Sequence, residues 1–428
     1  MRLRGRPNLF QSAMLRWREL HPYCASHVMV VPAALDEDRL RASIGRVLEV
    51  CGLTGLALDA DHRRYAFEGG PARVLLDRVE GNGAPFDRAA RKIEATINIA
   101  FPATGRFDPF RFFFVPATDH FLFGVTYDHF VAGGDSIAVL VTDIADHYID
   151  ETLLPTGLEL HPPPYLHLFA RNIGALVSGL RWFPELVAGW RRAIRPYLRD
   201  PADGTNGFAH FEISRDRLIR VRSAAHAWQV TTNDVMLALV LRAVAPLASQ
   251  RHPTGRRTQV ALASIVNLRR DFQPPATRAF GQFLSSFRVV HPLPSDESLE
   301  TVARSLAVQT ARARRLKLYL VTLLAIAASA ILWRFTAHER RHRLYIKYHP
   351  VFAGLTPLNV DALRRRPSSR EGGYLRAAST GPMAPMVVAT TTSGQSLRVG
   401  ITFRTTALSR SDVEAVIASI ERDMDSLS

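Results

Sequence analysis

Apolar and polar positions alternate along the first half of the chain with two different periods. Short runs rich in β-branched or aromatic residues predict buried strands, at residues 25–31, 110–115 and 121–127. Apolar positions at helical spacing predict helices, at residues 10–20, 36–50, 89–99 and 137–149. The two aromatic runs are joined by Pro116-Ala117-Thr118-Asp119, which predicts an antiparallel strand pair. We therefore expect the first half to be an α/β unit.

The second half repeats this alternation after a proline-rich boundary. Residues 152–164 end in Pro162-Pro163-Pro164, and residues 165–198 predict one or two helices that link the halves. The predicted strands of the second half are residues 208–213, 260–266, 283–290, 386–391 and 397–403. Its predicted helices are residues 216–228 and 232–247, further helices before residue 386, and a last helix that begins at Ser409 or Ser411. We expect a first lobe at 1–164, a helical crossover at 165–204 and a second lobe at 205–428.

Composition and charge narrow the classes of partner. The 428 residues are 47% hydrophobic, and Cys24 and Cys51 are the only cysteines, so we expect them to be small core residues rather than a disulfide framework. A net charge of +15 attracts polyanions such as coenzyme A, an acidic carrier protein, anionic lipid or nucleic acid. Arginine is spread along the whole chain, which argues against a nucleic-acid-binding arm. No apolar segment follows the basic N-terminus, so the expected location is the cytoplasm.

His129 is the first candidate for chemistry. It follows an apolar strand and precedes Gly133-Gly134 and a helix, so the strand fixes its backbone while the glycines permit a tight turn. A neutral imidazole there is suited to take a proton from an alcohol or amine that attacks a thioester. The alternative is a histidine that only caps the turn, and a lone histidine does not decide between the two.

The surrounding residues carry a resemblance. The segment 121–148, FLFGVTYDHFVAGGDSIAVLVTDIADHY, resembles the central strand, histidine loop and helix of the chloramphenicol-acetyltransferase-like, CoA-dependent acyltransferase superfamily, in its condensation-domain and wax-ester-synthase branches. Further blocks are similar in order and spacing, at residues 25–50, 231–238, 265–270 with 280–285, and 379–405. The resemblance spans nearly the whole chain.

The resemblance implies a fold and a reaction. The expected fold is α/β, with two lobes built as two-layer sandwiches whose mixed sheets surround a central tunnel. The expected function is acyl transfer in lipid or secondary-metabolite biosynthesis, with His129 as general base. The donor is expected to be an acyl-CoA or an acyl-phosphopantetheine carrier protein, with no bound cofactor and no metal. Gly133, Gly134, Asn267 and Arg269 are the residues expected to shape the substrate site.

Two departures from the family motif leave the activity open. Asp128 stands at the first motif histidine, and Gly133 stands at the motif aspartate, which in the family holds the loop through a salt bridge to an arginine. Asp135 is the nearest carboxylate and the expected substitute. The alternative is a catalytically inactive binding or scaffold protein that keeps the fold. Ser136 is interpreted as a helix N-cap rather than a nucleophile.

Residues 338–342, His338-Glu339-Arg340-Arg341-His342, match the pattern of zinc peptidases. The two arginines inside the motif would repel a divalent cation, and Glu371 has no support as a third ligand. We therefore interpret this segment as a solvated basic helix face rather than a metal site.

Residues 318–333 form the most apolar run of the chain. The run is shorter than the roughly 20 residues that span a bilayer, so a buried or lobe-bridging helix is the first interpretation. An interfacial contact with an anionic membrane is the alternative, because basic residues flank the run: Arg312, Arg314, Arg315, Arg340 and Arg341.

Overall fold

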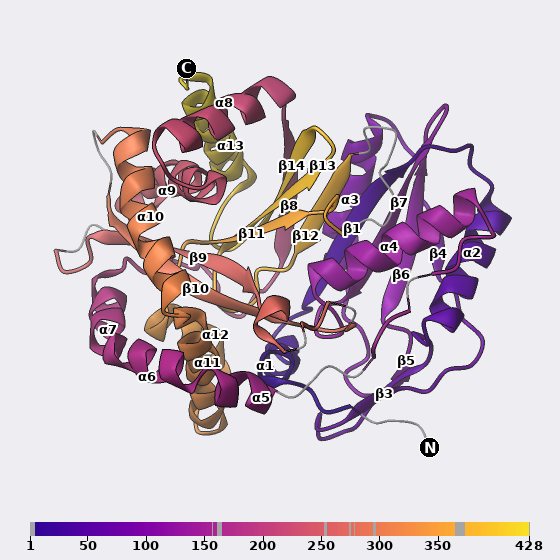
Figure 1. The fold of residues 1–428 in the computed structure, drawn as a ribbon, viewed down its shortest axis with the longest axis horizontal. Helices are drawn as coiled ribbons and strands as arrows, with labels where there is room; N and C mark the ends of the chain where they lie inside the picture. Colours follow the sequence, from indigo (N-terminus) through magenta and orange to yellow (C-terminus); the bar gives the residue numbers. More distant parts are fainter. Residues whose placement is uncertain are drawn as a thin grey trace.

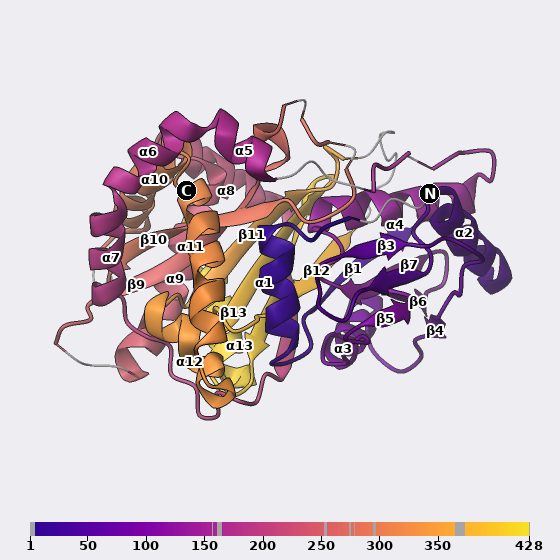
Figure 2. The ribbon, with the colours of Figure 1, turned by 90° about the horizontal axis from the view of Figure 1, so that it is seen from below.

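The computed structural model describes residues 5–155, 157–160, 165–251, 255–273, 275–277, 279–293, 297–363 and 373–427. Figures 1 and 2 show two α/β halves side by side, the first coloured indigo and purple and the second red, orange and yellow. The predicted two-lobed α/β architecture is confirmed. The proline run at 162–164, where the sequence predicts the boundary between the halves, lies outside the described residues.

A five-stranded sheet forms the first lobe, in the order β12-β1-β7-β6-β4. Its strands are β1 (Cys24–Val31), β4 (Leu76–Arg78), β6 (Phe110–Pro116), β7 (Phe121–Asp128) and β12 (Tyr374–Ala378). Helix α3 (Pro85–Ile97) covers one face and α4 (Gly134–Ile149) the other, with α2 (Glu37–Val50) packed on α4 (Figure 2). Because side chains alternate along β1, Ser26 faces α3 while the next residue, His27, faces α4.

A six-stranded sheet forms the second lobe, in the order β10-β9-β11-β13-β14-β8. Its strands are β8 (Asn206–Ile213), β9 (Gln259–Asn267), β10 (Leu284–Pro292), β11 (Ala353–Asn359), β13 (Met386–Ser393) and β14 (Ser396–Arg404). The helices packed with it are α8 (Arg215–Ala227), α9 (Thr232–Arg251), α10 (Leu299–Arg315) and α13 (Arg410–Asp425). A third, small sheet consists of three strands in the order β3 (Tyr65–Phe67), β2 (Leu56–Leu58) and β5 (Gly105–Phe107).

Strand β12 joins the two lobes. It lies between β11 and β13 in sequence, yet it pairs antiparallel with β1 of the first sheet, with Ala25 opposite Ala378 and Met29 opposite Tyr374. Asn98 and Asn206 tie the lobes again, because the Asn98 amide donates to the Asn206 carbonyl at 2.8 Å and accepts from its N–H at 2.9 Å. Residues from the second half therefore complete the first sheet.

The crossover and the α11 region form a layer of helices along one side of the molecule. Three short helices, α5 (Tyr165–Arg171), α6 (Ile173–Arg181) and α7 (Phe183–Arg192), replace the one or two that the sequence predicted. Asn172 separates α5 from α6, and Trp182 separates α6 from α7, each as the cap of a helix.

Helix α11 (Leu318–Arg334) contacts α6 of the crossover and β10 of the second lobe. It also contacts α1 (Leu9–Arg18) of the first lobe (Figure 2). A Cβ atom on Gly179 of α6 would lie 2.8 Å from Val321 of α11, so the two helices cross closely. Of the expected buried or lobe-bridging helix at 318–333, the bridging contacts are present, while Ile331 and Leu332 near its end are exposed.

One described helix, α9, is long and apolar enough to cross a membrane by length and composition. The segment that qualifies is 72% buried inside the protein, as in the core helix of a folded lobe. Helices α10 and α11 qualify only as a joined span, and they are bent by 76° at their junction.

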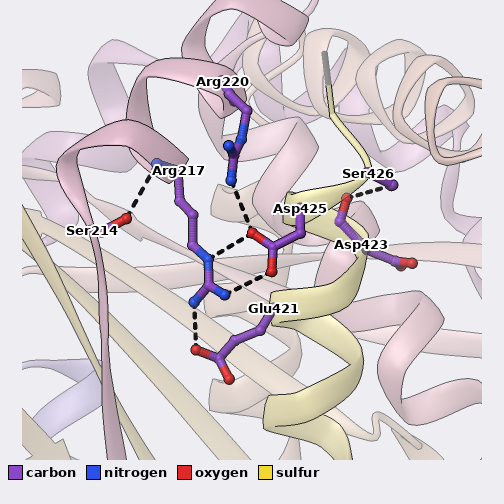
Figure 3. Close-up of polar contacts among 7 residues, drawn as sticks. All are labelled: Ser214, Arg217, Arg220, Glu421, Asp423, Asp425 and Ser426. Atoms are coloured by element: carbon purple, nitrogen blue, oxygen red, sulfur yellow. Dashed lines mark hydrogen bonds and ion pairs between the residues drawn. The ribbon is translucent and has the colours of Figure 1, made fainter.

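An ion-pair network fixes the last helix (Figure 3). Arg217 of α8 donates to both carboxylate oxygens of Asp425, at 2.9 and 2.7 Å, and to Glu421 at 2.6 Å. Arg220 reaches the same Asp425 at 2.9 Å. Helix α13 begins after Ser409, whose side chain accepts from the Asp412 N–H, so Ser409 rather than Ser411 is the N-cap.

Most of the predicted elements lie within a few residues of the observed ones. Cys24 and Cys51 are buried and form no disulfide, as expected. The small strands β2 to β5, and β11 and β12, were not predicted. Helix α4 begins at Gly134, three residues before its predicted start at Ile137.

Candidate active site

His129 lies where the two lobes meet, at the end of β7. Its backbone N–H donates to the Tyr23 carbonyl at 3.1 Å, and its ring lies between the rings of Tyr23 and Tyr127, at centroid distances of 5.4 and 5.8 Å. The side chain is only 8% exposed, and it lines a cavity of about 120 Å³. The walls of this cavity come from both sheets, including Ala377 of β12 and Ala263 of β9.

Gln282 of the second lobe holds the histidine loop. Its Nε2 donates to the carbonyls of Ala132, at 2.7 Å, and of His129, and lies 3.2 Å from the His129 Nδ1. The Gly133 N–H donates to the Gly281 carbonyl at 3.1 Å. The Nδ1 side of the imidazole is therefore covered by protein.

Burial controls the charge of the imidazole. It lowers the pKa of His129 to about 4, and the Arg376 guanidinium acts in the same direction, whereas a hydrogen bond to the Ala132 backbone opposes both. A histidine with this pKa is neutral at pH 7, so its unprotonated nitrogen is available as a proton acceptor.

Asp135, Asn267 and Arg269 come together across the lobe boundary. Asp135 lies in the first turn of α4, and its Oδ2 accepts a short hydrogen bond from the Asn267 side chain. The same oxygen lies 3.9 Å from the Arg269 Nε. A carboxylate therefore lies beside the second-lobe arginine although Gly133 has none, and Asp135 is in the position expected of a substitute for the motif aspartate.

Arg269 is itself buried and multiply bonded. It donates to the carbonyls of Ala276 and Ala279, at 2.8 and 2.5 Å, and to the Ser136 hydroxyl at 2.6 Å. The prediction that Ser136 is the N-cap of α4 is wrong, because the helix already begins at Gly134. The N-cap of α4 is Gly133, because the tie to Gly281 holds Gly133 extended and lets the helix start one residue later.

Gly134 permits a close approach between α4 and the first sheet. A Cβ atom on Gly134 would lie 3.0 Å from the Arg376 Nη1 and 3.6 Å from the His27 Cε1. Arg376 is buried on β12 and donates to the Thr391 hydroxyl at 2.8 Å and to the carbonyls of Thr356 and Thr390, at 2.7 and 3.0 Å. His27 and Arg376 both line the His129 cavity.

Comparisons with known proteins agree on the fold. No family model matches the chain, and no curated protein matches it in sequence. The first condensation domain of the calcium-dependent antibiotic synthetase, in complex with a substrate analogue, matches with a TM-score of 0.69 at 14% identity, over 99% of this chain and 97% of that one. The EpoB cyclization–docking bidomain from Sorangium cellulosum matches with a TM-score of 0.72 at 14% identity, over 100% and 84%. The epimerization domain from the third module of tyrocidine synthetase B gives 0.66 at 13%, over 99% and 96%. The chain has the condensation-domain fold.

This condensation-domain fold bears out the resemblance inferred from residues 121–148 and the two lobes that it implied. At the first motif position, Asp128 points away from the His129 cavity and lies 2.8 Å from Arg18, in a separate cavity. Burial raises the pKa of Asp128 to about 7, against the effect of Arg18.

Three residues of the site were not predicted from the sequence: His27, Gln282 and Arg376. Each is a polar residue within an otherwise apolar strand or strand-like passage. His27 is buried, with Nδ1 at 2.8 Å from the Tyr374 hydroxyl. The signal that could have found them is a lone polar side chain within a buried apolar run.

The zinc-peptidase pattern lies on α12 (His338–Tyr348), beside α11, and none of residues 338–342 lines the His129 cavity. The rings of His338 and His342 are 5.6 Å apart. Glu371 lies outside the described residues. The part of the chain that the structure describes holds no group of three His, Cys, Asp or Glu side chains arranged for a metal ion.

Proposed function

We propose that this protein transfers an acyl group from a thioester donor to a hydroxyl or amine, with His129 as general base. The observation that carries the proposal is the neutral, buried imidazole at a cavity between the lobes. Gln282 covers Nδ1, so Nε2 is the nitrogen that meets the acceptor. The names of the structural neighbours include condensation, cyclization and epimerization domains, which supports acyl transfer or a related reaction on this fold.

In the proposed reaction, Nε2 of His129 takes the proton from the acceptor O–H or N–H as the oxygen or nitrogen attacks the thioester carbonyl. A new ester or amide bond forms, the carbon–sulfur bond breaks, and the thiol leaves with the proton that His129 held. Arg376 contributes positive charge on the side of the cavity facing Gly134, where it would stabilise the developing oxyanion.

The donor is proposed to carry phosphates, as acyl-CoA or an acyl-phosphopantetheine carrier protein does. The net charge of +15 favours either donor, because arginine binds phosphate in a bidentate manner. The cytoplasmic location and contact with an anionic membrane stay predictions from the sequence.

The second candidate is a non-catalytic binding protein with the same fold. Gly133 at the motif aspartate favours it, since the expected carboxylate is absent from that position. Two sets of contacts favour the enzyme, because they hold the histidine loop without an aspartate at position 133. Gln282 bonds the loop, and Asp135 contacts Asn267 and Arg269.

The test compares acylated metabolites and lipids in the native host carrying wild type, His129→Ala or His226→Ala. His226 is exposed on α8, so its variant is the matched control. Loss of one acylated product in His129→Ala alone, at equal protein level, supports the acyltransferase. Unchanged profiles, in a host where deletion of the whole gene has an effect, support the binding protein.

A further inference from the structure

A larger cavity lies behind the His129 site, between the crossover helices and α11. Its volume is about 470 Å³, and we refer to it as the α11 cavity. Its walls are α6 and α7 on one side and α11 and α12 on the other, with Val321 and Ala325 of α11 among the lining residues. Ligand cavities of small-molecule sites are typically about 300–1,000 Å³, so this volume falls in their range.

The lining of the α11 cavity is apolar and uncharged. Leu180, Phe183, Trp190 and Leu344 contribute aliphatic and aromatic surface. Two of its polar groups bond within the protein: the Ser329 hydroxyl donates to the Ile326 carbonyl at 2.7 Å and lies 3.2 Å from the Tyr345 hydroxyl. Burial lowers the pKa of His349 to about 3, so this histidine is neutral. The cavity therefore suits an aliphatic group and disfavours an ion.

The α11 cavity adjoins the His129 site. Ile326 of α11 and Met383 line both cavities. At the other end, the lining residues become exposed: Leu180 and Tyr348 are 49% and 50% exposed. An extended ligand could therefore run from His129 past Ile326 and Met383 toward the surface beside α6 and α12.

We propose that the α11 cavity binds the aliphatic chain of a long-chain acyl donor whose thioester carbonyl lies beside His129. This inference rests on the proposed function, because it names the acyl chain of that reaction. An apolar cavity of roughly 150 Å³ holds one benzene molecule, so about 470 Å³ holds on the order of eighteen carbon atoms. Each buried methylene group strengthens binding about fourfold, which selects long chains over short ones.

Trp190 provides a direct probe of the cavity. Bromine quenches tryptophan fluorescence on contact, so binding of 16-bromohexadecanoate to the full-length protein is expected to quench Trp190 emission. The Trp190→Phe variant should lose most of this quenching. Ala325→Phe fills the cavity from α11 and is expected to weaken binding of the probe at least tenfold. Ala330→Phe adds the same ring at a position of α11 that does not line the cavity, and it should bind as wild type does.

Two results would overturn the inference. One is equal quenching in wild type and Trp190→Phe, and the other is equal affinity of wild type and Ala325→Phe for the probe. Binding of the free acid needs no catalysis, so the quenching experiment reports on the cavity whether or not the protein turns over. Failure of the inference is thus separate from failure of the proposed function, which the metabolite comparison decides.

Discussion

The guanidinium of Arg376 occupies the space that a side chain at Gly134 would need. The two residues belong to different halves of the sequence, yet a Cβ on Gly134 would lie 3.0 Å from the Arg376 Nη1. Arg376 has little freedom to move, because three hydrogen bonds to Thr356, Thr390 and Thr391 hold it. The start of α4, which directly follows the histidine loop, therefore packs closely against Arg376 from the second half of the chain.

Gly134→Ala is expected to destabilise the protein by about 1–3 kcal/mol, because the added methyl group must displace α4 or Arg376. Thermal unfolding measures this loss. Gly174→Ala is the control: a Cβ there meets no atom within 4 Å, and alanine in helix α6 should be neutral or stabilising. A Gly134→Ala protein as stable as Gly174→Ala would contradict the tight fit.

Asp135→Ala and Asn267→Ala are expected to be non-additive. Each removes the same hydrogen bond across the lobe boundary, so the double variant should lose less stability than the sum of the single losses. The expected coupling is about 0.5–3 kcal/mol, measured by urea unfolding. The pair of Asp135→Ala with Arg217→Met, which share no contact, should be additive within about 0.5 kcal/mol. Additivity in the first pair would mean that the contact does not tie the lobes.

Stability should fall between pH 6.5 and pH 4 in part because of His129. The unfolded histidine binds a proton below about pH 6.5, whereas the folded one, with a pKa of about 4, resists it. The unfolded state therefore takes up more protons over this range, and the free energy of unfolding decreases as the pH falls. The contribution is on the order of 3 kcal/mol.

Urea unfolding of wild type and His129→Gln at pH 7, 5.5 and 4.5 checks this expectation. The variant should lose stability less steeply with acid than wild type. Equal slopes for the two proteins would show that the imidazole is not kept neutral by burial.

Arg217→Met is expected to lower the melting temperature by loosening α13 from α8, since Arg217 bonds both Asp425 and Glu421 (Figure 3). Arg222→Met, at an exposed position of the same helix, is the control. In 1 M NaCl the difference between the two variants should shrink, because the screening length falls to about 3 Å and exposed charges then interact only weakly beyond it. A difference that is independent of salt would indicate lost side-chain packing rather than lost ion pairs.

Local patterns predicted much of the fold. The strand, histidine loop and helix at 121–149 were recognisable because their residues are contiguous, and the aromatic runs of β6 and β7 pair across a short turn. The start of α4 was misplaced because it depends on the contact of Gly133 with Gly281, which is remote in sequence.

Contacts between distant segments escaped prediction for the same reason. Strand β12 has only a short apolar pattern around Arg376, and nothing local indicates that it pairs with β1. Gln282 lies in a passage that the resemblance included, but its hold on the histidine loop depends on how the two lobes meet. Asp135 was proposed from its nearness to Gly133, and Arg269 and Asn267 do lie beside it.

The place of β12 in the first sheet also constrains how the protein can be made. During synthesis, β1 through β7 emerge long before residues 374–378, so the edge of β1 has no partner until almost the whole chain has been translated. An unpaired edge is a template for pairing with another chain. A nascent chain that stalls before β12 would thus expose this edge, and a fragment comprising the first lobe alone should aggregate unless the missing strand is supplied in trans as a peptide.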